Sequence, residues 1–219
     1  MATILHIDTA LEVASIAISA DEKCLDVQTN AVQNDHAAWL HTAIDSLLQK
    51  NKLTAASLDA VAVTIGPGSY TGLRVGLSSA KGLCYALQKP LLTIPSLQVL
   101  ATVAEAEPGQ LICPLIDARR MEVYYSLYDH HLTAITAPAA LILDENSFAE
   151  EMAVKKIIFC GNATEKFKKV CRHPHAVFCD RVACAADMPA LALKKFVKKE
   201  FADLAYCVPL YVKEFQQRT

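Results

Sequence analysis

Residues 60–65 form an apolar run, interrupted only by Thr64, that ends directly in a glycine-rich segment, and few folds accommodate such a junction. An apolar run of this length is typical of a strand buried on both faces of a sheet. The spacing of residues 71–88, after the glycines, favours a helix. The junction therefore predicts a strand–turn–helix unit and an α/β fold.

The first half of the chain has the order β-β-β-α-β-α-β. Short β-rich runs come first, and a polar break at 21–23 suits a hairpin. Asn34 or Asp35 can cap the first helix, whose apolar positions fall on one stripe. Strands are predicted at 3–7, 14–20, 24–30, 60–65 and 91–94, and helices at 36–49 and 71–88.

The second half is predicted to repeat this order. A local echo favours duplication, because Ile7-Asp8 precedes Glu12-Val13 much as Ile116-Asp117 precedes Glu122-Val123. We predict two lobes, 1–105 and 106–219, with the last helix packing back on the first. Strands are expected near 111–116, 122–128, 132–136, 156–160 and 176–179, and helices near 145–153, 162–172 and 184–201.

Composition narrows the class of protein. With 53% hydrophobic residues and a net charge of −2, the chain can bury a large core but has no strong basic character. Direct binding of nucleic acid by the isolated chain is therefore not favoured. Eight cysteines without a C-x-x-C pair indicate reduced thiols, and no apolar stretch is long enough for a membrane helix. We expect a cytoplasmic protein.

The segment 66–76, Gly-Pro-Gly-Ser-Tyr-Thr-Gly-Leu-Arg-Val-Gly, is the sharpest motif. Glycines at a helix start permit close approach, and free amides there can bind an anion. However, no lysine follows Gly72 as in a P-loop, the third glycine is one residue late for a dinucleotide fingerprint, and Pro67 lacks an amide proton. A packing turn and a phosphate-binding turn both remain possible, and the packing turn is favoured.

Small residues recur every four positions along the second helix, at Gly72, Gly76 and Ala80. Such a row permits close contact with another helix. Together with the stripe on helix 36–49 it predicts a helical interface with a partner protein. The alternative is that both stripes simply cover the sheet.

Six motifs spread along most of the chain form a set: Ile7-Asp8-Thr9, the 66–76 turn, Ile94-Pro95-Ser96-Leu97, Ile116-Asp117-Ala118-Arg119, Glu122-Val123-Tyr124 and Pro209-Leu210-Tyr211. Together they are similar to the TsaB (YeaZ) family, accessory subunits in the synthesis of threonylcarbamoyladenosine in bacterial tRNA. The resemblance implies a two-lobed, duplicated ribonuclease H-like fold of the acetate kinase, Hsp70 and actin type, with the second lobe reduced.

The resemblance also implies a non-catalytic scaffold that binds the catalytic subunit TsaD, with the ATPase TsaE joining the complex. It implies a homodimer when the chain is alone, and contact with tRNA only inside the complex. No catalytic residue, metal or cofactor is expected on this chain. The predicted partner-binding residues are His36, Trp39, Leu40, Ala43, Leu47, Thr71, Gly72, Arg74, Val75, Gly76, Ser79, Ala80 and Leu83, and the turn residues are Gly66, Gly68 and Ser69.

Catalysis by the chain itself is not favoured. The catalytic sibling is expected to bind metal through H-x-x-x-H, whereas Ser96 and Leu100 occupy the matching positions here and cannot ligate a metal. Two rivals stay open: a small-molecule kinase or ATPase of the same fold, using Asp8 and Asp117, and a peptidase. The lysines of the last helix (Lys194, Lys195, Lys198 and Lys199) are interpreted as a solvated face, with a contribution to tRNA binding as the alternative.

Overall fold

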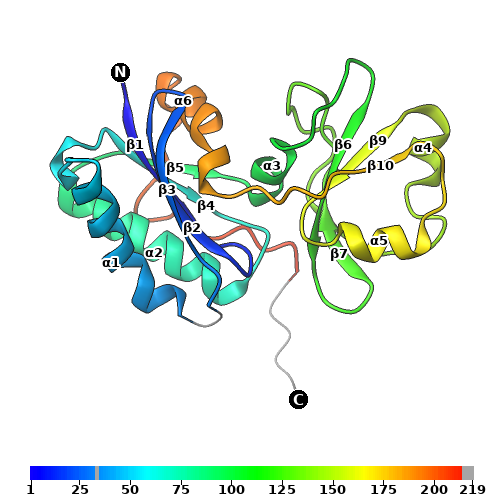
Figure 1. Ribbon diagram of the computed structural model, residues 1–219, viewed down its shortest axis with the longest axis horizontal. Helices are drawn as coiled ribbons and strands as arrows, with labels where there is room; N and C mark the ends of the chain where they lie inside the picture. Colours follow the sequence, from blue (N-terminus) through cyan, green and yellow to red (C-terminus); the bar gives the residue numbers. More distant parts are fainter. Residues whose placement is uncertain (33–34, 214–219) are drawn as a thin grey trace. The chain divides into compact units, whose positions relative to one another are not determined.

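The computed structural model describes residues 1–32 and 35–213 (Figure 1). It divides the chain into two compact units. Unit 1 contains Met1–Val99 and Cys184–Leu210, and unit 2 contains Leu100–Ala183 with the described residues from Tyr211 onward. The chain first passes from unit 1 to unit 2 between Val99 and Leu100, inside α3 (Ser96–Ala101). The boundary predicted at residue 105 lies shortly after this helix.

Unit 1 is built on a five-stranded sheet in the order β3-β2-β1-β4-β5. β1, β2 and β3 are antiparallel neighbours, and β4 and β5 run parallel to β1. The strand β4, which lies between β1 and β5, is buried at every position, as its apolar run predicts. The strands are β1 (Thr3–Asp8), β2 (Ala14–Ala20), β3 (Lys23–Asn30), β4 (Ala60–Thr64) and β5 (Leu91–Ile94).

Helices cover both faces of this sheet. α1 (His36–Lys50) and α2 (Tyr70–Leu87) pack on one face, and α6 (Pro189–Val197) packs on the other (Figure 1). Short 3-10 turns, Ala55–Ser57 and Ala185–Asp187, precede β4 and α6. The predicted element order of this half is confirmed. Asp35 precedes α1 without capping it through its side chain, and Asn34 lies outside the described residues.

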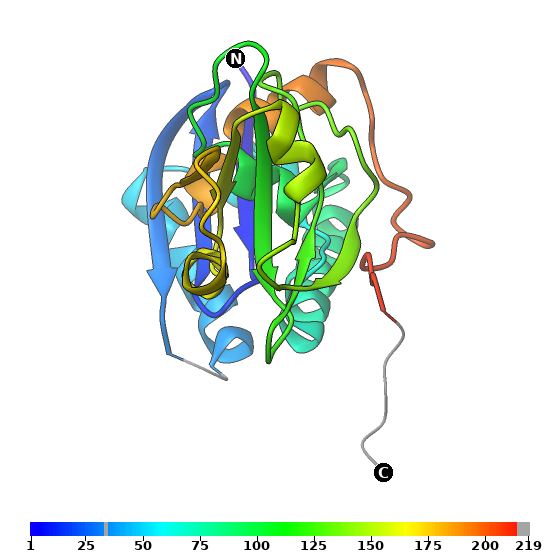
Figure 2. The ribbon, with the colours of Figure 1, turned by 90° about the vertical axis from the view of Figure 1, so that its right-hand side faces the viewer.

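Unit 2 has its own five-stranded sheet in the order β10-β9-β6-β7-β8. α4 (Ala149–Val154) and α5 (Thr164–Val170) lie in front of this sheet in Figure 2. Between the helices and the sheet, Phe148, Phe159 and Phe167 pack on one another with ring centroids 4.8–5.6 Å apart. The strands are β6 (Leu111–Asp117), β7 (Glu122–Tyr125), β8 (Ala139–Ile142), β9 (Ile157–Cys160) and β10 (Ala176–Phe178).

The two sheets share one strand order, since β8-β7-β6-β9-β10 repeats β3-β2-β1-β4-β5. In each unit one helix follows the third strand in chain order and another follows the fourth. This topology, rather than the local echo, carries the duplication. Asp8 pairs with Ser15, whereas Asp117 pairs with Val123, so Val123 corresponds to Ser15 and not to Val13.

The predicted strand at 132–136 is wrong, because β8 follows later in the chain. Asp129 explains the difference: its carboxylate accepts hydrogen bonds from the amides of His131 and Thr133, at 2.9 and 2.8 Å, and so forms a turn. Such side-chain bonds compete with strand pairing. Similarly, the hydroxyl of Ser147 donates to Asp144 at 2.9 Å, and α4 begins only after this turn.

The segment 184–210 belongs to unit 1, whereas the sequence analysis assigned it to the second lobe and expected only its helix to pack back on the first. The amide of Ala185 donates to the Ser15 hydroxyl at 2.9 Å, and the amide of Ala202 donates to the Leu91 carbonyl at 2.8 Å. These bonds tie both ends of α6 to the sheet. The predicted helix at 184–201 is accordingly a 3-10 turn followed by the shorter α6.

Two chemical features of the described chain bear on its class. Within residues 1–32 and 35–213, none of the helices combines the length and apolar character needed to cross a membrane. All eight cysteines are free thiols, and burial raises the pKa of Cys84 to about 11.

Candidate partner-binding surface

The glycine-rich turn joins β4 to α2 and is held by two distant segments of unit 1. Gly66 has φ +116° and accepts no side chain, because a Cβ there would lie 2.4 Å from the carbonyl oxygen of Leu210. The Gly66 amide donates to the Ser96 hydroxyl at 3.1 Å, and the Ser96 amide donates back to the Gly66 carbonyl at 2.9 Å. The Gly66–Pro67 peptide is cis.

The other glycines of the turn pack against the loop after β1. A Cβ on Gly68 would lie 2.4 Å from the Ala10 carbonyl oxygen, and one on Gly72 would lie 2.1 Å from the Thr9 carbonyl oxygen. The Ser69 amide donates to the Ala10 carbonyl, and the Thr9 hydroxyl donates to the Gly72 carbonyl, each at 2.7 Å. Thr9 and Ala10 therefore occupy the side of the turn on which a phosphate would need room, and these contacts favour the packing interpretation.

The row of small residues on α2 faces inward, which corrects the prediction that it meets a partner helix. A Cβ on Gly76 would lie 2.2 Å from the Thr9 hydroxyl oxygen, and Ala80 is fully buried. The row lies on the same face as the buried Leu73 and Leu77, so it can only cover the sheet. Six predicted residues belong to the core of unit 1 for this reason: Leu40, Ala43, Leu47, Gly72, Gly76 and Ala80.

The remaining predicted residues, apart from the buried Gly66, lie at or near the surface of α1, α2 and the turn. Trp39, Val75 and Leu83 are partly buried and pack against the core, whereas Thr71 and Arg74 are exposed. The Arg74 guanidinium lies 3.9 Å from the centroid of the Tyr70 ring. The other members are the half-buried His36 and Ser79 and, in the turn, the buried Gly66, the half-buried Gly68 and the exposed Ser69.

A second row of small residues, which the sequence analysis missed, faces outward from α2. Ser78 and Gly82 are exposed and lie one turn apart, and a Cβ on Gly82 would meet no atom within 4 Å. On α1, Ala38 and Thr42 form a matching exposed pair. We call these four residues, with His41, the α1–α2 surface.

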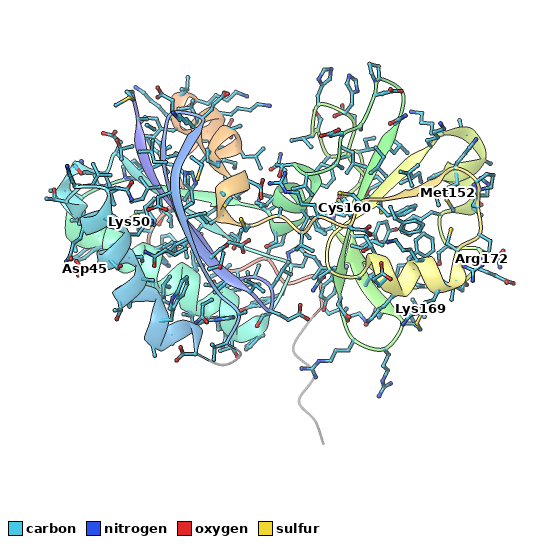
Figure 3. All side chains as sticks on the ribbon, viewed as in Figure 1. Asp45, Lys50, Met152, Cys160, Lys169 and Arg172 are labelled. Atoms are coloured by element: carbon cyan, nitrogen blue, oxygen red, sulfur yellow. The ribbon has the colours of Figure 1, made fainter. Side chains whose placement is uncertain are left out.

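A hydrogen bond joins the two helices at the α1–α2 surface, between His41 Nε2 on α1 and the Ser79 hydroxyl on α2 at 3.2 Å. The other members of this surface, Ala38, Thr42, Ser78 and Gly82, have no ionisable side chain. Asp45, which projects from the outer side of α1 in Figure 3, lies one turn beyond His41. A low-charge surface with small side chains allows another helix to approach closely.

The two aspartates considered for kinase chemistry form equivalent turns in the two units. The Asp8 carboxylate accepts from the Ala10 amide at 3.0 Å, and the Asp117 carboxylate accepts from the Arg119 amide at 2.6 Å. Burial raises the pKa of Asp8, and its hydrogen bonds from Ala10 and Thr64 oppose that shift. Both carboxylates thus already have protein donors.

In the part of the chain that the structure describes, no three histidine, cysteine, aspartate or glutamate side chains gather closely enough to hold a metal ion. His175 directs Nδ1 to the Met152 carbonyl at 2.7 Å. The Cys179 thiol points to the Val103 carbonyl at 3.6 Å.

Two mixed five-stranded sheets of identical strand order define a two-domain α/β protein of the acetate kinase, Hsp70 and actin fold class. The activator of 2-hydroxyisocaproyl-CoA dehydratase from Clostridium difficile is a solved structure that is similar to this chain in fold. Its TM-score is 0.50, with 9% identity over 92% of this chain and 98% of that chain. YeaZ from Pseudomonas aeruginosa matches more closely, with a TM-score of 0.81 and 25% identity over 96% of this chain and all of that chain.

Sequence comparisons narrow the class to a family. The family model of TsaD, tRNA N6-adenosine threonylcarbamoyltransferase, matches residues 27–212. The tRNA threonylcarbamoyladenosine biosynthesis protein TsaB of Bacillus subtilis is 35% identical over 58% of this chain and 56% of its own length. The protein of that name from Haemophilus influenzae is 34% identical over 57% and 52%, so the chain spans about half the length of these relatives. The chain belongs to the TsaB/YeaZ family.

Proposed function

We propose that this chain is a non-catalytic scaffold in the synthesis of threonylcarbamoyladenosine in tRNA, and that it binds a TsaD-like catalytic subunit through the α1–α2 surface. The names of its relatives support the pathway. The partner's reaction passes the threonylcarbamoyl group from its adenylate to N6 of the adenosine 3′ to the anticodon.

The outward row on α2 is the observation that carries this proposal. Gly82 in the interior of an 18-residue helix costs about 1 kcal/mol relative to alanine, and no contact within unit 1 requires it. Ser78, one turn before it on α2, and Thr42 on α1 are also small and exposed. Close packing of a partner's helix on the α1–α2 surface would explain both the glycine at position 82 and the low charge of the surface.

The chemistry is better placed on the partner than on this chain. The Ser96 and Leu100 side chains cannot replace the H-x-x-x-H metal ligands of a catalytic subunit. The turn that would cradle a phosphate packs instead on Thr9 and Ala10. Cofactor and nucleotide would then belong to the TsaD-like and TsaE-like subunits.

The same surface suits a second copy of the chain when the TsaD-like subunit is absent. A two-fold dimer uses one patch on both copies, and a surface with small side chains at its contact positions is compatible with that arrangement. Binding of the TsaD-like subunit would then replace one copy. A TsaE-like ATPase would join the assembled pair.

Co-elution on size-exclusion chromatography tests the surface. Gly82→Leu places a bulky side chain on the α1–α2 surface without a clash inside unit 1, and it should abolish co-elution with the TsaD-like subunit of the same organism. Ala190→Leu is the matched control, because Ala190 is exposed on α6, on the opposite face of the sheet. Equal co-elution of both variants would refute the assignment of the surface.

A further inference from the structure

Four lysines gather at the C-terminal end of α6 in unit 1. Lys194 and Lys195 lie in the last turn of the helix, and Lys198 and Lys199 follow directly. We call these four residues the α6 lysine cluster. The ion pairs within it share one carboxylate, because Lys195 and Lys198 both approach Glu200, at 3.9 and 3.8 Å. The cluster therefore keeps a local excess of positive charge.

The end of α6 has the hydrogen bonds of a Schellman motif. The amide of Lys199 donates to the Phe196 carbonyl, and the amide of Glu200 donates to the Lys195 carbonyl, each at 3.0 Å. Lys199 takes φ +56°, a position that glycine fills more easily. The turn brings Phe201 to 6.0 Å from Phe196, centroid to centroid, and leaves Phe201 44% exposed.

A structural role alone explains only part of the cluster. Lysines in the last turn of a helix interact favourably with its dipole, and Lys194 and Lys195 satisfy that role. Lys199, by contrast, lies beyond the last helical residue and in a backbone conformation that disfavours it. A purely structural turn would be better served by glycine there.

The position of α6 keeps the cluster accessible when a partner binds. α6 packs on β1, β3 and β5, on the face of the sheet opposite α1 and α2 (Figure 1). A subunit on the α1–α2 surface would therefore leave the α6 lysine cluster open to a further ligand.

We propose that, within the assembled complex, the α6 lysine cluster binds the phosphate backbone of tRNA and Phe201 stacks on an unpaired base, an inference that rests on the proposed function. Lysine ammonium groups neutralise phosphates and release counterions, and an exposed aromatic ring can stack on an unpaired base. Because the whole chain has a net charge of −2, this contact adds to the affinity of the complex and does not replace the partner's own contacts.

The salt dependence of tRNA binding tests the proposal. In the complex with the TsaD-like subunit, Lys194→Gln with Lys198→Gln should weaken tRNA binding. The slope of log K against log salt concentration should fall by about 0.7–0.9 for each phosphate that is no longer neutralised. Lys23→Gln with Lys52→Gln is the matched control, since both lysines are exposed in unit 1 and the change in charge is the same. The control should leave the slope unchanged.

A second variant separates binding from folding. Lys199→Gly should raise the melting temperature, because glycine tolerates this backbone conformation, yet should also weaken tRNA binding. An unchanged slope in the cluster variant, or an equal fall in the control, would overturn the proposal.

Co-elution with the TsaD-like subunit is recorded for each variant, so that the two proposals fail independently. Loss of co-elution in the cluster variant would assign these lysines to an acidic surface of that subunit and overturn tRNA binding. If the wild-type chain itself does not co-elute, the proposed function fails. The isolated chain is then titrated with tRNA at low salt, and no difference between wild type and the cluster variant would overturn the inference as well.

Discussion

Replacing Gly72 by alanine should destabilise unit 1, whereas the same replacement at Gly82 should stabilise it. Both glycines lie in α2, so each change gains up to about 1 kcal/mol in helix propensity. At Gly82 the new Cβ meets no atom within 4 Å, and the gain should appear in full. At Gly72 the new Cβ would lie 2.1 Å from the Thr9 carbonyl oxygen.

Relief of that clash requires a shift of backbone, since the nearest atom is not the end of a flexible side chain. Overpacking of this kind costs about 1–3 kcal/mol. The hydrogen bond from the Thr9 hydroxyl to the Gly72 carbonyl would weaken too, at a cost of about 1 kcal/mol. After the propensity gain, Gly72→Ala should lower the free energy of unfolding by about 2 kcal/mol. The two variants should then differ by about 3 kcal/mol.

Urea unfolding followed by tryptophan fluorescence measures this difference in the relevant unit. Trp39 is the single tryptophan of the chain and packs against the core of unit 1, so its emission reports on that unit. Midpoints are compared at constant m value, which separates stability from a change in the unfolded state. Equal stability of the two variants would refute the close packing of the turn on Thr9.

Two further predictions concern unit 1. Burial lowers the pKa of His6 to about 3, so between pH 6.5 and 3 the unfolded state binds a proton that the folded state does not, and stability falls with falling pH. Between pH 7 and pH 5 this histidine should lower the free energy of unfolding by about 2 kcal/mol. The difference in unfolding free energy between wild type and His6→Gln should therefore shrink by that amount over this range. A constant difference would contradict the buried, neutral ring. Lys81→Met should loosen the segment 203–210 after α6, because Lys81 donates to the carbonyls of Ala205 and Cys207 at 3.4 and 3.1 Å. Amide exchange over 203–210 should accelerate at least about fivefold by mass spectrometry, as one hydrogen bond is worth about 1 kcal/mol, and unchanged exchange would show that other contacts hold the tail.

Regular patterns made much of unit 1 predictable from the sequence. The apolar run at 60–65 identified the strand buried on both faces, now β4, and the stripe from Leu40 to Leu48 identified the inner face of α1. The order of elements in the first half could be deduced from such local signals alone. In unit 2 the strand expected at 132–136 failed, because the side-chain bonds of Asp129 make a turn there.

The direction in which the small-residue row faces was beyond the sequence. A spacing of four shows that Gly72, Gly76 and Ala80 share a face, but both a core and an interface use small residues at that spacing. The contact that decides the matter comes from Thr9, more than sixty residues away, and nothing local signals it. The outward row was detectable in principle, since Ser78 and Gly82 have the same spacing, but the serine made it resemble an ordinary solvated face.

Threonylcarbamoyl transfer to tRNA by the TsaD-like subunit of the same organism tests the scaffold role most directly. It is measured without this chain, with the wild-type chain, and with the Gly82→Leu and Ala190→Leu variants. Transfer should require the wild-type chain, should persist with Ala190→Leu, and should be lost with Gly82→Leu although that variant remains folded. Full transfer without the chain, or with Gly82→Leu, would contradict a scaffold that acts through the α1–α2 surface.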